Sequence, residues 1–246
     1  MNIKAGIIIQ ARISSTRLPK KIILEVEKDT TFLDVLLKRL SILKKSIPII
    51  LATSNLEVDD VLEKYSNKHQ IKFFRGSEQH VLDRFIKCAE KNNLNSIIRI
   101  CSDNPFIDVE SILEVYENYK GEDYLSYKIN HLPSILTHYG FFCEIVSLSA
   151  LKRIYRENSI DCFEHVTNCI YTNPNKFNVR FIEKSIDNKN IRCTLDTKGD
   201  FKNLRKLYFD IVKDKPEIGY LDIIKYIEKE SSITKSMRKI IKENSK

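Results

Sequence analysis

The sequence is poor in the residues and patterns that mark several protein classes. Its 246 residues include no tryptophan, six glycines and six prolines, and they contain neither an internal repeat nor a low-complexity segment. No apolar run approaches the roughly 20 residues that a membrane-spanning helix needs. The apolar run Ile7–Ile9 is too short for a signal peptide and is followed by charged residues. These absences favour a globular, cytoplasmic protein.

Enough apolar sequence is present to build a substantial core. Hydrophobic residues make up 42% of the chain and charged residues 30%. A chain of this length can close such a core within one domain. We therefore expect a single domain over residues 1–230, followed by a basic tail over residues 231–246. The most basic part of the tail, residues 235–246, would be a frayed, solvated helix.

The six cysteines form no recognisable redox or metal-binding pattern. They include no CxxC pair, and we expect reduced, partly buried thiols. Cys162, His165 and Cys169 would share one face of a helix, but the neighbouring sequence supplies no fourth ligand for a structural zinc ion. The sequence therefore does not favour a zinc site.

The chain is basic, with a net charge of +8 and an isoelectric point near 9.0. Its 33 acidic residues are interleaved with the basic ones, and no RRM, KH or zinc-finger pattern is present. A cleft for a small polyanionic substrate explains this charge as well as nucleic acid does. We expect a small-molecule substrate, and neither nucleic acid nor membrane as a partner.

The stretch Ala5–Lys21 joins a strand to a basic loop. Ile7–Ile9 is apolar and β-branched, as in a parallel strand buried on both faces. The loop that follows is rich in hydroxyls and cations, which donate hydrogen bonds to the oxygens of a polyphosphate. Neither GxGxxG nor GxxxxGK occurs in it, so it is neither a dinucleotide fingerprint nor a Walker loop. The alternative is a solvated basic surface loop.

Apolar periodicity predicts alternating strands and helices in the first half of the chain. A helix begins at Thr31, where Asp34 has the spacing of a capping box. The expected elements that follow are a strand at 47–53, a helix near 58–65, a strand at 72–74, a helix near 81–89 and a strand at 96–101. This order implies right-handed crossovers and a mostly parallel sheet in a three-layer α/β/α fold.

The alternation breaks after a helix near 112–119. We expect strands around a loop within 124–147, helices at 148–156 and 163–172, strands at 179–182 and 192–195, and closing helices near 201–212 and 221–228. Eight apolar residues of the stretch 124–164 would form a costly patch if they faced water, so they either fold back on their own domain or lie in a dimer interface. They are Tyr124, Leu125, Tyr127, Ile129, Leu132, Ile135, Leu136 and Tyr139.

Polar groups follow four of the expected strands: the loop 10–21, Thr53 with its neighbour, Asp103 and Asp196. Parallel strands end at the same edge of a sheet, so we expect these groups to converge. Two carboxylates facing a basic loop suit a magnesium ion and a polyphosphate. The ordinary alternatives are that Asp103 is a turn residue before Pro105 and that Asp196 caps the next helix.

The segment QARISSTRLPKK at 10–21 resembles the (P/Q)ARxxSxRLPxK signature of cytidylyltransferases that activate acidic sugars, the CMP-octulosonate (KDO) and CMP-acylneuraminate synthetases. RICSDNPFID and CTLDTKGDF resemble the family segments RVTGDxPLID and LTVDTxEDF. The likeness is closest to the branch of spore-coat polysaccharide biosynthesis cytidylyltransferases and extends from Ile7 to about Leu207. Lys20 and Ser102 stand where the family pattern has glycine.

This resemblance implies a Rossmann-like nucleotidyltransferase that transfers CMP from CTP to an acidic sugar of the nonulosonate or octulosonate type, or to a related acceptor, with release of pyrophosphate. The product would serve the biosynthesis of a surface polysaccharide or glycan. The resemblance also implies a Mg²⁺ cofactor held by Asp103 and Asp196, and a homodimer built by an excursion over residues 124–164.

Further roles follow position by position from the resemblance. Arg12 and Lys21 would bind the β- and γ-phosphates, with support from Ser15 and Arg17. Partners for cytosine or ribose would be the backbone of Ala11 and the side chains of Thr53, Arg75 and Ser77. His165 matches a histidine near the acidic sugar. Candidate cations for the acceptor's carboxylate are Arg99, Arg153, Arg156, Arg180 and Arg192.

Three rival functions remain open at this point. The same chemistry could use another nucleoside triphosphate, or a phosphonate or polyol phosphate acceptor. A glycosyltransferase is less favoured, because Asp103 is followed by Asn104-Pro105 instead of completing a DxD motif. A nucleic-acid-binding module would rest on the basic charge alone.

Overall fold

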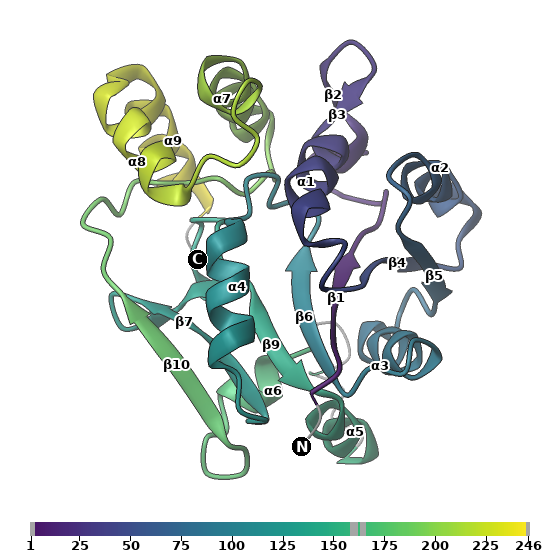
Figure 1. Ribbon diagram of the computed structural model, residues 1–246. Helices are drawn as coiled ribbons and strands as arrows, with labels where there is room; N and C mark the ends of the chain where they lie inside the picture. Colours follow the sequence, from purple (N-terminus) through teal and green to yellow (C-terminus); the bar gives the residue numbers. More distant parts are fainter. Residues whose placement is uncertain (1–2, 158–161, 163–165, 245–246) are drawn as a thin grey trace.

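Strand β1 (Ala5–Gln10) lies in the middle of the sheet in a computed structural model that describes residues 3–157, 162 and 166–244 (Figure 1). It pairs in parallel with β4 (Ile49–Ser54) on one side and with β6 (Ser96–Cys101) on the other. β5 (Lys72–Gly76) extends the sheet beyond β4, again in parallel. The strands predicted for the first half of the chain are therefore confirmed.

The second half of the chain widens the same sheet. β9 (Glu144–Ser147) runs antiparallel between β6 and β7 (Tyr124–Ile129), and β10 (Val179–Lys184) pairs in parallel with β7. Within the described residues the strand order is β10–β7–β9–β6–β1–β4–β5, with the short β8 (Leu132–Pro133) on β7. The sheet is mostly parallel, as predicted.

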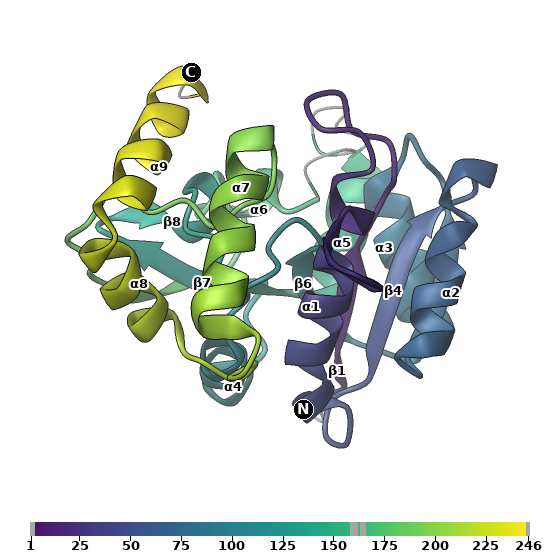
Figure 2. The same ribbon diagram turned by 90° about the horizontal axis from the view of Figure 1, so that it is seen from above.

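Helices cover both faces of the sheet. Their bounds are α1 Phe32–Leu40, α2 Val61–Lys68, α3 Val81–Lys91, α4 Val109–Asn118, α5 Leu148–Glu157, α6 Asn168–Tyr171, α7 Lys198–Leu207, α8 Tyr220–Lys229 and α9 Ser231–Asn244. Ile7 and Ile9 of β1 enter the core that α1, α4 and α7–α9 close, and Ile8 enters the core that α3, α5 and α6 close. Figure 2 shows the sheet between these layers, which confirms the α/β/α fold. No helix formed by the described residues has the length and apolarity to cross a membrane.

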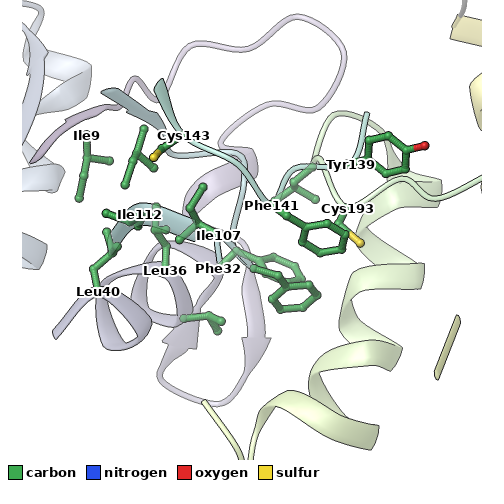
Figure 3. Close-up of a cluster of buried hydrophobic side chains, with 14 of the residues drawn as sticks. Ile9, Phe32, Leu36, Leu40, Ile107, Ile112, Tyr139, Phe141, Cys143 and Cys193 are labelled. Atoms are coloured by element: carbon green, nitrogen blue, oxygen red, sulfur yellow. The ribbon is translucent and has the colours of Figure 1, made fainter. Parts of the chain in front are cut away.

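Phe32 of α1 joins three segments of the first core. Its ring packs edge-on against Phe106, with centroids 6.4 Å apart, and against Phe201 of α7, at 5.6 Å. Figure 3 shows Phe32 in one cluster with Phe141, which comes from the chain between β8 and β9. Such edge-on pairs add to the free energy gained by burial alone. This packing fixes the turn after β6, which carries Asp103, and the start of α7, which lies just after Asp196 in the chain.

The predicted start of α1 is confirmed in detail. The Thr31 side chain accepts a hydrogen bond from the Asp34 amide, and the Asp34 carboxylate accepts one from the Thr31 amide at 2.9 Å. This reciprocal capping box satisfies two amides that the first helical turn leaves unpaired. The small hairpin of β2 (Glu25–Glu27) and β3 (Thr30–Thr31) that precedes α1 was not expected from the sequence.

Two predicted elements differ from the structure. Residues 192–195 are not a strand: they run beside the sheet and bond to loops, with Cys193 N–H donating to the His138 carbonyl at 3.0 Å. Apolar alternation there reflects burial of Cys193 and Leu195 without strand pairing. Of the helix expected over 163–172, the structure describes α6, while residues 163–165 lie outside the described residues.

The C-terminal stretch also differs from the expected solvated tail. α9 buries Ile233, Met237 and Ile240 and packs against α7. These three residues are spaced to share one face of a helix, with basic residues between them. Because the stretch is rich in lysine, the narrow apolar stripe is not evident from the sequence. The stripe makes α9 part of the main core.

Most of the apolar patch anticipated in residues 124–164 folds inward. Tyr124, Leu125, Tyr127, Ile129 and Tyr139 are buried, the first four within β7. The other three of the eight stay exposed on β8 and the following turn: Leu132 at 57%, Ile135 at 37% and Leu136 at 60%.

The expectation that all six cysteines are reduced is wrong for one pair. Cys162 and Cys169 form a disulfide, with Cα atoms 5.9 Å apart, while the other four thiols are free. The argument from overall cysteine usage concerned the class of protein and could not identify a pair seven residues apart. His165, the third member of the considered zinc set, lies outside the described residues.

We expect Met237→Ala to lower the free energy of unfolding by about 2–5 kcal/mol, because it removes a fully buried side chain between α9 and the core. Lys239→Ala, on the exposed face of the same helix, is the matched control and should change little. Urea denaturation followed by circular dichroism measures both. Equal stability of the two variants would contradict the packing of α9.

Candidate active site

A polar cleft of about 340 Å³ lies at the carboxyl ends of β1 and β6. This is the edge at which open α/β sheets bind ligands. Its lining is rich in cations and hydroxyls and includes two carboxylates. The lining residues are Gln10, Arg12, Ser14, Ser15, Thr16, Arg17, Lys21, Arg99, Cys101, Ser102, Asp103 and Asp196.

Backbone hydrogen bonds bring the two carboxylates together. Asp103 follows β6, and the Ser102 amide donates to the Gln10 carbonyl of β1 at 3.0 Å. The Leu195 amide donates to the Asp103 carbonyl at 2.8 Å, which places Asp196 beside Asp103. The predicted convergence therefore occurs, although a loop and not a strand delivers Asp196.

Asp103 has the ordinary position considered from the sequence: it lies in the turn before Pro105, where the Asn104 amide donates to the Cys101 carbonyl at 3.1 Å. Asp196 does not cap the next helix. The N-cap of α7 is Thr197, and the N-cap of α4 is Asp108. Both Asp103 and Asp196 direct oxygen atoms at one ammonium group. Lys21 Nζ lies 2.7 Å from Asp103 Oδ2 and 2.8 Å from Asp196 Oδ1.

Lys21 and Asp196 stay charged because each compensates the other. Burial alone would lower the pKa of Lys21, but the charges of Asp103 and Asp196 raise it above its usual value. Burial would raise the pKa of Asp196, but Lys21, Arg17 and Arg192 lower it. Arg17 Nη2 lies 3.1 Å from Asp196 Oδ1, and its side chain remains 55% exposed.

A fully buried arginine holds Asp196 from behind. Arg192 Nη2 lies 3.2 Å from Asp196 Oδ2, and Arg192 Nε donates to Asp200 Oδ1 at 2.7 Å. Asp200 also accepts the amides of Asp196 and Thr197, at 3.0 and 2.8 Å. The start of α7 and Arg192 therefore fix both the backbone and the side chain of Asp196.

The segment around Arg192 is supported from two further sides. Arg192 Nη1 donates to His138 Nδ1 at 2.7 Å, and burial together with Arg192 lowers the pKa of that histidine. The Arg192 amide contacts the Met237 sulfur of α9 at 3.4 Å. Gly140 has φ +70°, and a Cβ atom there would lie 2.7 Å from the Cys193 carbonyl oxygen. Only glycine permits this close approach.

These supporting residues were not identified from the sequence. The sequence suggests Arg192 only as a partner for the acceptor, and it indicates no role for Asp200 or His138. One signal was available, because Thr197 and Asp200 have the spacing of a capping box. The contribution of His138 depends on tertiary contact and has no local signature.

A second buried network forms the floor of the cleft. Arg99 Nη1 donates to Glu144 Oε1 at 2.7 Å, while its Nη2 donates to Gln10 Oε1 at 2.9 Å. Glu144 also accepts the hydroxyls of Tyr124, at 2.6 Å, and Thr167, at 2.9 Å. Both charged groups are almost fully buried, so the network fixes the orientation of Gln10.

Of the five arginines considered for an acceptor carboxylate, Arg99 alone is in the cleft lining. Arg153 pairs with Asp123 and Arg180 with Glu122. Arg156 is exposed on α5, and Arg192 is enclosed by its partners behind Asp196.

The basic loop is held in place at its base. The Ile13 amide donates to Asp59 Oδ1 at 2.7 Å, and the Lys20 amide donates to the Ile13 carbonyl at 3.3 Å. Lys20 has a left-handed conformation with φ 57°, which turns the chain before Lys21. The predicted phosphate-binding residues Arg12, Ser15 and Arg17 line the cleft together with Lys21.

The residues expected near cytosine or ribose are not in the cleft lining. The Ala11 amide donates to the Ala52 carbonyl at 3.1 Å, and the Arg75 guanidinium bonds to Asp60 and to the carbonyls of Ser54 and Leu56. Thr53 is fully buried, and its hydroxyl finds no hydrogen-bond partner among the described residues.

Ser77 and His165 are the other residues predicted to contact the substrates. The Ser77 hydroxyl accepts the His80 amide at 3.1 Å, in the turn before α3. It is outside the cleft lining as well. His165, the predicted acceptor contact, lies outside the described residues.

Comparison of the sequence with known families and proteins gives a consistent result. The model of a family described as "Cytidylyltransferase" matches residues 6–241. The spore coat polysaccharide biosynthesis protein SpsF of Bacillus subtilis is 34% identical over 227 residues, which is 88% of this chain and 91% of SpsF. A 3-deoxy-manno-octulosonate cytidylyltransferase of Rickettsia bellii is 33% identical over 123 residues, 48% of this chain and 49% of that protein.

Solved structures agree with the sequence comparisons. A cytidylyltransferase from Leptospira borgpetersenii superposes with a TM-score of 0.83 at 29% identity, covering 95% of this chain and 97% of that one. A CMP:2-keto-3-deoxy-manno-octonic acid synthetase complexed with CTP shares the fold, with a TM-score of 0.58 at 16% identity over 84% of this chain and 98% of that one. The chain belongs to the cytidylyltransferase family and is a nucleotidyltransferase.

Proposed function

We propose that this protein transfers CMP from CTP to a hydroxyl of an acidic sugar of the nonulosonate or octulosonate type, or of a related acceptor, for the synthesis of a surface polysaccharide or glycan. The observation that carries the proposal is the pair of carboxylates, Asp103 and Asp196, facing the cationic loop across one cleft. The substrates named for the octulosonate relatives support the choice of CTP and of a sugar acid.

The cleft residues suit the charge changes of this reaction. The acceptor hydroxyl oxygen attacks the α-phosphorus of CTP and loses its proton to water. The bond from that phosphorus to the bridging oxygen of the β-phosphate breaks, and pyrophosphate leaves with the electron pair. Arg12, Arg17 and Lys21 would bind the phosphate oxygens and stabilise the charge that develops on the leaving group. The reaction needs no covalent intermediate on the protein.

The donor set at the cleft fits a hard divalent cation. Asp103 and Asp196 offer carboxylate oxygens. The described residues contain no group of three or more His, Cys, Asp and Glu side chains that could hold a metal by themselves, so this pair would need further ligands. Mg²⁺ typically binds through one or two carboxylates and takes its other ligands from water and phosphate. When bound, Mg²⁺ would stabilise negative charge on the phosphates.

The floor of the cleft offers one arginine to an acceptor carboxylate. Arg99 lines the cleft, but its charge is balanced by Glu144. The acceptor's carboxylate would therefore also depend on loop cations such as Arg12 and Arg17. A cytoplasmic location would follow from the use of CTP, which is a cytoplasmic metabolite.

Pyrophosphate release tests the proposed function. The protein, with Mg²⁺, is incubated with CTP, ATP, GTP or UTP and with a panel of sugar acids, neutral sugars, a phosphonate and a polyol phosphate. We expect release with CTP and a sugar acid only. Pyrophosphate release with another nucleotide would contradict the choice of CTP. Pyrophosphate release with a neutral or phosphorylated acceptor, but with no sugar acid, would contradict the choice of acceptor.

We expect Asp103→Asn and Asp196→Asn each to lower turnover by about 100-fold or more, since each removes a charge where charge develops. Asp222→Asn is the matched control, because that carboxylate is 64% exposed on α8. Circular dichroism verifies the fold of all three variants. Turnover near that of the control in either cleft variant would assign that carboxylate a structural role.

We also propose that the protein is a homodimer through the exposed apolar residues of β8 and the following turn. Leu132 and Leu136 are more than half exposed, which is unfavourable on a free surface. Light scattering should give twice the chain mass of 28.8 kDa, and Leu136→Asp should shift the mass to that of one chain. Leu221→Asp, on exposed α8, should leave the dimer intact. A wild-type mass of one chain at micromolar concentration would refute the dimer.

A further inference from the structure

Lys21 lies where a cation bound by both carboxylates would lie. Its ammonium is 2.7 Å from Asp103 Oδ2 and 2.8 Å from Asp196 Oδ1, and the side chain is 14% exposed. Asp103 and Asp196 are the residues to which the proposed function assigns the divalent cation. The ammonium and the metal ion would therefore compete for the same two oxygens.

Three cations contact Asp196: Arg17, which is 55% exposed, and the more buried Lys21 and Arg192. Of these, Lys21 alone also contacts Asp103, and it is held less firmly than Arg192. Arg192 is fully buried and is held by Asp200 and His138. Lys21 carries a compact charge on a flexible four-carbon stem, at the end of a loop that lines the cleft.

The charges of the cluster balance without a metal ion. Three carboxylates face three cations: Asp103, Asp196 and Asp200 against Lys21, Arg17 and Arg192. A divalent ion arriving alone would have to displace an ammonium from its two partners. A triphosphate changes this balance, because its oxygens offer the ammonium new partners in the same cleft.

We propose that Lys21 is an exchangeable counter-ion: it holds Asp103 and Asp196 together in the nucleotide-free enzyme and moves to the triphosphate when a divalent cation takes its place. Metal binding and nucleotide binding are then coupled, and by linkage each strengthens the other. The proposal rests on the proposed function, because it takes the metal ligands and the triphosphate from it.

The test is a titration of the nucleotide-free protein with Mn²⁺, with free Mn²⁺ followed by electron paramagnetic resonance. Wild-type protein should bind Mn²⁺ weakly, and Lys21→Met should bind it at least about tenfold more tightly, in the range of typical coupling between sites. Lys21→Arg keeps a cation in the loop and should stay close to wild type. Lys20→Met, which removes an exposed charge one residue away, is the matched control and should also match wild type.

Two results would overturn the proposal. One is a Lys21→Met affinity for Mn²⁺ no higher than that of wild type in a variant whose melting curve shows a folded protein. The other is micromolar binding of Mn²⁺ by nucleotide-free wild type. This result would overturn the proposal even if Lys21→Met does not fold. Neither measurement needs turnover, so a failed pyrophosphate assay and a failed counter-ion test are distinguishable. Normal pyrophosphate release together with an unchanged Mn²⁺ affinity would remove only the counter-ion role.

Discussion

Charge compensation around two carboxylates is the constraint on which this cleft depends. Asp103 and Asp196 lie close enough for one ammonium to contact both, and unpaired like charges at such separation are strongly unfavourable. The structure meets this demand with Lys21 from the loop after β1 and Arg192 from behind. The sheet order, the loop anchor at Asp59 and the start of α7 all serve to bring these charges to one edge.

The sequence predicted the fold best where local pattern and tertiary environment agree. The apolar, β-branched runs of β1, β4 and β6 are buried on both faces, so their strand character is visible without knowledge of partners. The strand predicted at residues 192–195 is wrong, because these residues are apolar owing to burial and do not pair with another strand. α9 misleads in the opposite sense, since its three buried residues are diluted by lysines.

The residues of the site also fall into two groups, those that the sequence predicts and those that it does not. Asp103, Asp196 and the basic loop could be predicted, because parallel strands end at one edge and the family segments carry these residues. Arg192, Asp200 and His138 act through contacts between distant segments, which a linear pattern does not record. The resemblance also suggested Arg75 for the nucleotide, but its guanidinium is occupied by the loop between β4 and α2.

The contact between the Arg192 amide and the Met237 sulfur has a consequence for the order in which the protein forms. The nucleotide loop and Asp103 are made early in synthesis, and Asp196 follows. The segment that orients Asp196 gains part of its support from α9, which lies further along the chain than Asp196. Because a chain is synthesised from its N-terminus, the residues of the phosphate-binding loop exist well before those that secure the acidic pair. The acidic pair is thus secured only after α9 has been made.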